Sequence, residues 1–445
     1  MLRYYPSSIR LKNKFLSING QHFGVMESQI LTTAKGKYAP NISVCTANMP
    51  DYHKILVDEM AEMNHHLSGY GIYFEESMIR LLGEGIERYA LLIASDIYKD
   101  KEIKASYNEI IKLGETMPWE YIDMYSKEDY KKLRDTTNIR QIDRDTKISW
   151  VKCPSIFDKT KEIFIPAQLL FLGFRNQQER EALFAPGFSK GSAAHVTLEN
   201  ALESAIMEAV EADAFTINWY TSRKARRIVV DDYELMEIIS KATKDIDCEV
   251  IVLEYSLEGM PGHTVGVALI NKSGNRPTVV LGCQSALDPK KAIYKALLEA
   301  LAIYYLATNG PLLLPHLYLA SVDDNNYNNL DSNVAFWANQ SNLEMKKSYF
   351  YDLCQEEILL SSLECYEKEN QLKQVKEVIE KIGKISKYGV YLDITPPEVA
   401  EKGWKVIRTF FPELVQMCLP SYPYSNHPRL KEYGGVSNVL PHPVP

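Results

Sequence analysis

The stretch SKGSAAHVTLENALESAIMEAVEAD, residues 189–213, carries the pattern from which the fold can be interpreted. Thr197 suits the N-cap of a helix that continues to about residue 220, because its hydroxyl can accept a hydrogen bond from the first turn. At about 100° per residue, Glu208 and Glu211 point the same way from this helix, and the apolar residues occupy the other side. No Lys or Arg shares the face of the two carboxylates. Ion pairs within the helix therefore do not explain the presence of these two carboxylates.

A second carboxylate pair, Glu84 and Glu87, lies on a helix expected over about residues 75–95. Arg80 and Arg88 share its polar face, opposite an apolar one. Two interpretations stay open for this face: a solvated surface with i, i+4 ion pairs between Arg80, Glu84 and Arg88, or a set of metal ligands. Two such pairs in one chain suit Mg²⁺, a hard cation that prefers oxygen ligands and often bridges carboxylates to phosphates.

The segment before the helix that starts near Thr197, residues 189–194, is rich in small residues. Backbone amides in such a segment, next to a helix N-terminus, can approach a phosphate. The segment matches neither a Walker loop nor the Gly-rich loop of kinases. A nucleotide site here would therefore be of an unusual type.

The bulk composition is that of a globular protein, with 445 residues, 46% hydrophobic and 24% charged, and a net charge of −8. The absence of a run of basic residues argues against nucleic-acid binding. The seven cysteines are scattered and never spaced Cys-x-x-Cys, which argues against a disulfide framework and a structural zinc site. No stretch is apolar enough for a signal peptide or a membrane span, so we expect a cytoplasmic protein without membrane contact.

Helical and strand signals alternate, which favours an α/β (α+β) fold with a sizeable sheet. A helix begins at Asp288-Pro289, where Asp suits the N-cap and Pro suits the first helical position. Strands are expected over residues 249–254, 264–270, 278–281 and 389–393, a long Asn-, Asp- and Ser-rich surface loop over residues 322–342, and a charged helical segment over residues 355–384.

In chain order, these segments resemble the nucleotide-binding motifs of the YcaO family. Gly69-Tyr70-Gly71, followed by Glu84, Glu87 and Arg88, resembles the first motif, a glycine turn that leads into S-x-x-x-E-x-x-E-R. Residues 189–213 resemble the second motif, S-N-G-x-A-x-G…E-A…E-x-x-E-R-D, in particular at Gly191, Ala193, Glu208, Glu211 and Asp213. The segment from Asp288-Pro289 to Glu299 resembles the third, with Lys295 and Glu299 at the positions of an arginine and a glutamate four apart.

The C-terminal half extends the resemblance to residues 68–445 and leaves residues 1–67 as an N-terminal segment expected to pack on the core. The matching stretches are DITPP (393–397), VIR (406–408), NHPRL (426–430) and PHPVP (441–445). The chain stops at Pro-x-Pro-x-Pro, as azoline-forming members of the family do. The resemblance implies a large YcaO-type domain with mixed sheets and helices packed around an ATP site.

By this resemblance, the chain is an ATP-dependent peptide cyclodehydratase with ATP and Mg²⁺ as cofactors. In such enzymes a Cys, Ser or Thr side chain of a ribosomally made precursor peptide attacks the preceding amide carbonyl. The oxyanion takes the γ-phosphoryl group of ATP, and loss of phosphate leaves a thiazoline or oxazoline. The implied metal ligands are Glu84, Glu87, Glu208 and Glu211. The implied ATP-binding residues are Arg80, Lys190, Ala193, Asn200, Lys295 and Glu299, with Arg80 and Lys295 near the phosphates.

The final Pro-x-Pro-x-Pro segment is stiff and extended, because proline fixes φ. The resemblance gives it a catalytic role, in which Pro441, Pro443 and Pro445 order the active site and place the terminal carboxylate there. An ordinary frayed terminus is the alternative. Implied partners are the precursor peptide and a leader-peptide-binding protein of the E1-like or ocin-ThiF type, because nothing before Ser68 resembles a peptide-binding module. An FMN-dependent azoline dehydrogenase often accompanies such enzymes, and a homodimer within the complex is compatible with the sequence.

Several positions depart from the family motifs: Tyr70 (lysine in the motif), Arg80 (serine), Lys190 (asparagine), Val196 (asparagine), Asn200 (glutamate), Ala212 (arginine) and Lys295 (arginine). Two alternatives therefore stay open beside azoline formation. One is ATP-dependent backbone thioamidation, against which the proline tail argues. The other is a non-catalytic scaffold subunit, which Val196, Asn200 and Ala212 support. The five glutamates that remain at motif positions favour retained ATP chemistry.

Overall fold

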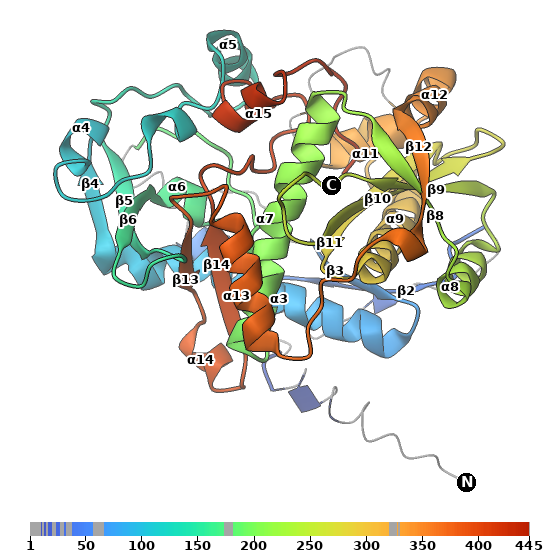
Figure 1. Ribbon diagram of the computed structural model, residues 1–445, viewed down its shortest axis with the longest axis horizontal. Coiled ribbons are helices and arrows are strands. Elements are labelled where there is room, and N and C mark those ends of the chain that lie inside the picture. The colour runs from blue at the N-terminus through green and yellow to red at the C-terminus, as the bar shows by residue number, and fades with distance from the viewer. Residues whose placement is uncertain are drawn as a thin grey trace.

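The computed structural model describes residues 38–56, 66–172, 181–319, 327 and 330–444, and before residue 38 only residues 10, 13–14, 17–19, 24–26 and 31–32. The described chain forms a mixed α/β fold in which several small sheets and one larger sheet surround helix α7 (Leu198–Tyr220) (Figure 1). The expected fold class is confirmed.

The strands are β1 (Leu31–Thr32), β2 (Ser43–Asn48), β3 (His66–Gly71), β4 (Glu102–Ala105), β5 (Ile148–Pro154), β6 (Glu162–Pro166), β7 (Ser192–His195), β8 (Ala225–Val229), β9 (Cys248–Glu254), β10 (His263–Asn271), β11 (Val279–Ala286), β12 (Cys354–Leu359), β13 (Val390–Asp393) and β14 (Lys405–Phe410). Besides α7, the α-helices are α2 (Tyr52–Leu56), α3 (Phe74–Tyr98), α4 (Tyr107–Ile110), α5 (Lys127–Thr136), α6 (Ala167–Leu170), α8 (Tyr233–Thr243), α9 (Pro289–Leu313), α10 (Pro315–Leu319), α11 (Leu330–Ala338), α12 (Leu343–Leu353), α13 (Gln371–Ile382), α14 (Pro397–Ala400) and α15 (Pro428–Glu432). Among the described helices, even the 25-residue α3 and α9 fall short of the apolar character that a bilayer crossing demands.

The largest sheet has the strand order β11-β10-β9-β8-β12 and is antiparallel except for the pair β8 and β12. All nine residues of β10 are buried, because α9 packs on one face of the sheet and α7 on the other. Alternate side chains of β10 accordingly join different cores. Val267 packs in the cluster that contains Ala296 of α9, whereas Ala268 belongs to the cluster that contains Phe215 of α7.

Helix α7 also packs on the small antiparallel sheet of β13, β14 and β7. In Figure 1 it runs between this sheet and the largest one. Helix α3 packs on β7 and on β3, so α3 and α7 approach the same small strand. The consequence for α7 is that every residue over 209–220 is buried.

Two hairpin–helix units, β2–β3–α3 and β10–β11–α9, share one layout, in which a strand glycine faces the backbone of the following helix. A Cβ atom at Gly69 would lie 2.0 Å from the carbonyl oxygen of Ser77 in α3. One at Gly282 would lie 2.3 Å from the carbonyl oxygen of Ala296 in α9. Only glycine, which has no Cβ, permits a strand and a helix to come this close.

The helices that carry the carboxylate pairs are confirmed. Helix α3 contains the expected residues 75–95, and α7 begins after Thr197, whose hydroxyl accepts a hydrogen bond from the amide of Asn200. Asp288 caps α9 in the same way, with Pro289 at the first helical position. The strands expected over residues 249–254, 264–270, 278–281 and 389–393 correspond to β9, β10, β11 and β13.

Two expectations are wrong in part. The expected surface loop over residues 322–342 contains α11, whose residues Phe336 and Trp337 are buried. The expected charged helical segment over residues 355–384 starts instead with β12, an exposed edge strand that runs parallel to β8. The charged residues that suggested a helix also suit an exposed edge strand. Glu357 lies opposite Arg227, with 3.6 Å between their charged groups. Helix α13 confirms only the later part of that segment.

The C-terminal segment is buried rather than frayed, over the part that the structure describes. His442 is 0% exposed, and Asn333 of α11 donates from Nδ2 to the carbonyl oxygens of His442 (2.6 Å) and Val444 (2.9 Å). The indole of Trp337 donates to the carbonyl of Pro441 at 2.8 Å. Pro445, the last residue of the expected catalytic tail, lies outside the described residues.

Replacing Gly69 by alanine should lower the free energy of unfolding by about 3 kcal/mol, because the added methyl group presses on the backbone of α3. Gly83→Ala, a change within α3 itself, is the matched control. Nothing lies within 4 Å of a Cβ atom at Gly83, and alanine favours a helix by about 1 kcal/mol over glycine, so stability should rise. Urea unfolding measures both changes, and a loss of equal size in both variants would contradict the close contact.

The burial of His442 predicts an acid-sensitive C-terminal segment. Burial lowers the pKa of His442 to about 4, whereas the unfolded chain takes up a proton at this residue near pH 6.5. Stability that is present above pH 6.5 should therefore be lost as the pH falls towards 4, by up to about 3 kcal/mol for this residue alone.

Urea unfolding at pH 7 and pH 5 should show a smaller loss of stability in His442→Gln than in the unmodified chain. Burial also lowers the pKa of His427 to about 4, and this residue stays in both proteins as an internal reference. An unchanged pH dependence in His442→Gln would show that His442 is not held neutral by the fold.

Candidate active site

Three helices direct five glutamates into one region between the sheets. Helix α3 carries Glu84 and Glu87, α7 carries Glu208 and Glu211, and α9 carries Glu299. Helices α3 and α7 both pack on β7, and helices α7 and α9 both pack on β11. Helix α7 therefore lies between the helices that carry the other three glutamates. We call these five side chains the carboxylate cluster.

Each carboxylate of the cluster accepts a hydrogen bond from a strand or turn beside it. Glutamates of this kind are fixed in place before any ligand arrives, because four backbone amides and one serine hydroxyl hold them. The donors and distances are the Ser68 amide to Glu84 (2.9 Å), the Ser192 hydroxyl to Glu87 (2.7 Å), the Gly191 amide to Glu208 (3.3 Å), the Ser285 amide to Glu211 (3.1 Å) and the Cys283 amide to Glu299 (2.7 Å).

Burial and mutual repulsion raise pKa values within the cluster. Burial, with the charge of Glu208 adding to it, raises the pKa of Glu87 to about 8. Burial raises the pKa of Glu299 to about 7, and the charge of Glu211 acts in the same direction against the nearby Lys190. The pKa of Glu208 is raised as well, mainly by burial. A divalent cation would offset this excess of negative charge, so the residues fit Mg²⁺.

Lys190 supplies the cation that α7 lacks on its own polar face. Its Nζ atom lies 2.5 Å from Oε1 of Glu211, and the two side chains are 19% and 3% exposed. Burial alone would lower the pKa of Lys190, but the charges of Glu211, Glu208 and Glu299 raise it well above its ordinary value. The ammonium group is therefore firmly charged inside the cluster.

Lys295 and Arg80 extend the positive charge of the site. Burial lowers the pKa of Lys295, whose charged neighbours include Glu211 and Arg80. Among the described residues, Lys295 has no hydrogen bond or ion pair, which leaves its donors available to a ligand. Arg80 pairs with Glu76 at 3.0 Å rather than with Glu84, so the Arg80–Glu84 pair of the solvated-surface interpretation is not formed. The other expected pair, Arg88 with Glu84, is present at 3.8 Å.

Arg408 of β14 lies at the cluster although it was not among the predicted site residues. Its guanidinium donates from Nη1 to the carbonyl oxygens of Ser189 (3.0 Å) and Lys190 (2.6 Å), and from Nη2 to that of Leu169 (3.1 Å). Burial lowers its pKa to about 10, against the charges of Glu208 and Glu87. An arginine inside the apolar run KVIRTF was the signal that could have identified it, because buried charges require partners.

The turn that Arg408 holds has a fixed shape. Gly191 has φ +92°, and a Cβ atom there would lie 2.8 Å from the carbonyl oxygen of Thr409. The one hydroxyl hydrogen of Ser192 is shared between the carbonyl oxygen of Ser189, at 2.5 Å, and Glu87. Gly191 therefore meets both a conformational and a steric requirement of this turn.

The remaining predicted residues lie at different distances from the cluster. Ala193 is buried in β7, directly after this turn. Asn200 lies in the first turn of α7, about 12 Å along the helix axis from Glu208. In the described part of the chain, its side chain makes no hydrogen bond with the cluster. Val196 is 44% exposed and Ala212 is 0% exposed. The structure thus brings together the five glutamates, Lys190 and Lys295, but not Asn200.

The proline tail runs past the same helix that holds Glu208 and Glu211. Phe215 lies one turn after Glu211, and its ring packs edge-on against His442 with 5.8 Å between centroids. Pro441 and Pro443 are buried. Among the residues that the structure describes, no hydrogen bond joins the tail to the cluster. The catalytic role of Pro441, Pro443 and Pro445 stays a prediction.

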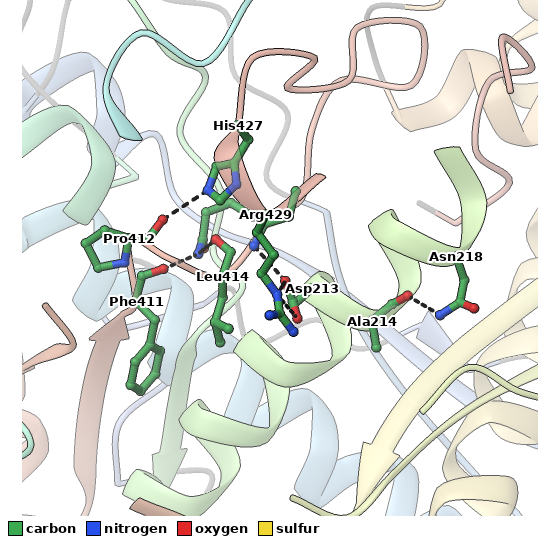
Figure 2. A network of polar contacts seen from close by, with 10 residues as sticks. Asp213, Ala214, Asn218, Phe411, Pro412, Leu414, His427 and Arg429 are labelled. Carbon is green, nitrogen blue, oxygen red and sulfur yellow. Dashed lines mark hydrogen bonds and ion pairs between the residues drawn. The ribbon is translucent and has the colours of Figure 1, made fainter. Parts of the chain in front are cut away.

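Asp213, although part of the same motif as Glu208 and Glu211, is paired with Arg429 (Figure 2). Both oxygens of its carboxylate share the one Nε–H of Arg429, at 2.9 and 3.0 Å, and Oδ1 also accepts from the amide of Val415 at 2.8 Å. Close by, the His427 ring is hydrogen-bonded to the carbonyl of Pro412 at 3.0 Å. The residues 426–430 therefore fasten the C-terminal half of the chain to α7.

A second group of potential metal ligands, Asp288, Cys365 and Glu367, lies apart from the cluster. Its members already have other partners, since Asp288 caps α9 and Glu367 pairs with Lys291 at 2.6 Å. Cys365 is exposed. Nothing about this group indicates a bound ion.

Comparisons with solved structures identify the same fold. A heterocyclase in complex with substrate and cofactor is similar at a TM-score of 0.71 and 17% identity, over 92% of this chain and 52% of the other. The chain thus spans about half the length of that enzyme. YcaO from Methanopyrus kandleri bound with AMPPCP and Mg²⁺ is similar at a TM-score of 0.62 and 14% identity, over 93% and 92% of the two chains. A chain of the E. coli microcin synthetase McbBCD complex, also solved with pro-MccB17 bound, gives 0.54 and 16%, over 87% and 88%.

No curated protein sequence matches the chain at a significant level. The family model for YcaO cyclodehydratases that bind ATP and Mg²⁺ matches residues 68–415, which is most of the chain and includes the whole carboxylate cluster. Since the match covers this length and the fold is that of solved YcaO structures, the chain belongs to the YcaO family, whose cofactors are ATP and Mg²⁺.

Proposed function

We propose that the chain catalyses the ATP-dependent cyclodehydration of Cys, Ser or Thr residues in a ribosomally made precursor peptide, which gives thiazolines or oxazolines. The observation that carries this proposal is the carboxylate cluster, in which each glutamate is held by a donor of a neighbouring strand or turn. Such a set of fixed oxygen ligands suits Mg²⁺ and a triphosphate.

The proposed roles follow the positions of the charges. Lys295 and Arg80 contact the phosphates, and Glu299 completes the nucleotide shell. Lys190 and the backbone near Ala193 face the nucleotide from the fixed turn before α7. The proposed metal ligands are Glu84, Glu87, Glu208 and Glu211.

The chemistry explains why a nucleotide is needed at all. An amide oxygen is a poor leaving group, and bound ATP supplies the phosphoryl group that makes it a good one. The chain itself contributes position and charge, because its fixed carboxylates and cations do not have to reorganise during the reaction.

The proline tail favours azoline formation over backbone thioamidation within this family. Its buried course beside Phe215 supports a role in ordering the site, since a stiff segment beside α7 restrains the helix that carries Glu208 and Glu211. We propose that Pro441, Pro443 and Pro445 act in this way.

The proposed partners are a precursor peptide and a separate protein that binds its leader, of the E1-like or ocin-ThiF type. The microcin synthetase complex and the heterocyclase with bound substrate support this arrangement, because both similar proteins were solved as assemblies or with substrate. An FMN-dependent dehydrogenase that oxidises the azolines and a homodimer within the complex belong to the same proposal.

Glu208→Gln should reduce Mg²⁺-dependent ADP release, measured with peptide and partner protein present, by a factor on the order of 100 or more, because one fixed charge at the cation is lost. Glu199→Gln in the first turn of the same helix is the matched control and should leave the rate nearly unchanged. A complex that assembles but shows no Mg²⁺-dependent ADP release with the unmodified chain would instead support the scaffold alternative, for which Asn200 and Ala212 argue.

Removing Val444 and Pro445 should abolish ring formation while binding of a non-hydrolysable ATP analogue stays within about twofold, since the tail acts on the order of the site rather than on nucleotide contacts. Mass spectrometry of the precursor peptide measures the loss of one water per ring. Val439→Ala, a change at a 77% exposed tail residue, is the control. Unchanged water loss after truncation would refute the role of the tail, and exchange of oxygen for sulfur in the peptide would establish thioamidation.

A further inference from the structure

We infer that the ammonium group of Lys190 takes the place of one divalent cation in the carboxylate cluster, so that the chain binds one metal ion fewer than the cluster would hold without it. This inference rests on the proposed function, because it concerns how the cluster is neutralised when nucleotide binds. The cation in question is the side chain of Lys190, which is covalently part of the chain.

The ammonium group forms an ion pair inside the cluster rather than at the surface. Its Nζ atom lies 2.5 Å from Glu211, and the nearby charges are those of Glu208 and Glu299. Those three carboxylates come from two helices, α7 and α9. A mobile surface lysine would pair with one neighbour on its own element, whereas Lys190 reaches across from the preceding turn.

The backbone around Lys190 is held as firmly as the carboxylates are. Arg408 binds the carbonyl oxygens of Ser189 and Lys190, and Ser192 closes the turn onto Ser189 and Glu87. The side chain therefore leaves a fixed turn and enters the cluster. A group held in this way loses little conformational freedom when a ligand binds.

The contacts of Glu211 leave little room for a metal ion. Its Oε1 atom accepts from Lys190 and its Oε2 atom accepts from the amide of Ser285. Glu87 and Glu208, which repel one another across α3 and α7, each accept a hydrogen bond from a neutral donor and have no lysine bound. The geometry thus divides the cluster into a Glu87–Glu208 side open to Mg²⁺ and a Glu211–Glu299 side neutralised by Lys190. Glu211, proposed above as a metal ligand, is therefore the partner of Lys190 as long as that lysine is present.

The remaining donors of Lys190 give it a second use. An ammonium group has three N–H donors, and within the described residues only Glu211 accepts from Lys190. Two donors stay free for phosphate oxygens. The ammonium group would thus bridge a carboxylate to the phosphates, as Mg²⁺ does, but with one positive charge in place of two and independently of the Mg²⁺ concentration.

The test counts metal ions directly. Mn²⁺ bound per chain is measured by electron paramagnetic resonance, at saturating non-hydrolysable ATP analogue, for the unmodified chain and for Lys190→Met and Lys190→Asn. We expect both neutral variants to bind about one additional Mn²⁺ per chain. Lys190→Arg keeps the charge and should keep the count. Lys241→Met, which removes an exposed lysine that pairs with Glu237 at 2.6 Å, is the matched control and should also keep it.

A second readout needs no nucleotide. Without Lys190 the cluster has lost its fixed cation, so Mg²⁺ alone should raise the Tm of Lys190→Met by more than it raises that of the unmodified chain. A neutral variant that folds only when Mg²⁺ is supplied would support the inference equally, because the ion then replaces the ammonium group. A neutral variant that stays unfolded with and without Mg²⁺ would overturn it.

The outcomes separate this inference from the proposed function. Equal Mn²⁺ counts in the unmodified chain and the neutral variants, with analogue bound in all, would overturn the role of Lys190 and leave the proposed function intact. Failure of the unmodified chain to bind the analogue would overturn both.

Discussion

Hydrogen bonds from backbone amides to the glutamates of the cluster are the interaction on which the rest of the site depends. The amides of Ser68 and Cys283 reach Glu84 and Glu299, and each amide is next to a strand glycine that touches the following helix. The close approach of strand and helix and the amide–carboxylate bond are therefore two aspects of one contact. Without a fixed donor for each carboxylate, burial of so many like charges would separate them or leave them protonated.

Helix α7 carries this arrangement to the C-terminal half of the chain. Glu208 and Glu211 of this helix belong to the cluster. Farther along the helix, Asp213 is paired with Arg429, and Phe215 packs on His442 of the tail. Arg408 adds a connection from β14 to the turn of Lys190. These packed and hydrogen-bonded groups are the physical basis on which the proposed role of the tail rests, since they would carry a change in the C-terminal segment to the glutamates of α7.

Local sequence signals predicted the helices and the carboxylate pairs, because caps and periodicity act over a few residues. Thr197 and Asp288 cap α7 and α9 as their neighbours in sequence indicated. The contacts that complete the site are not local, and caps and periodicity do not indicate them. The partner of Glu211 comes from the turn before α7, and Asn333, which suggested a loop, is buried against a tail 109 residues away. Tertiary packing, rather than local composition, determines the structure of these segments.

The most direct test of the account is a structure of the chain with a non-hydrolysable ATP analogue and Mn²⁺, in which anomalous scattering locates the ions. The account predicts Mn²⁺ at about 2.2 Å from carboxylate oxygens of Glu87 and Glu208, the triphosphate beside Lys295, and the Lys190 ammonium group still on Glu211. Ions and nucleotide bound away from the three helices, with the five glutamates unoccupied, would contradict it.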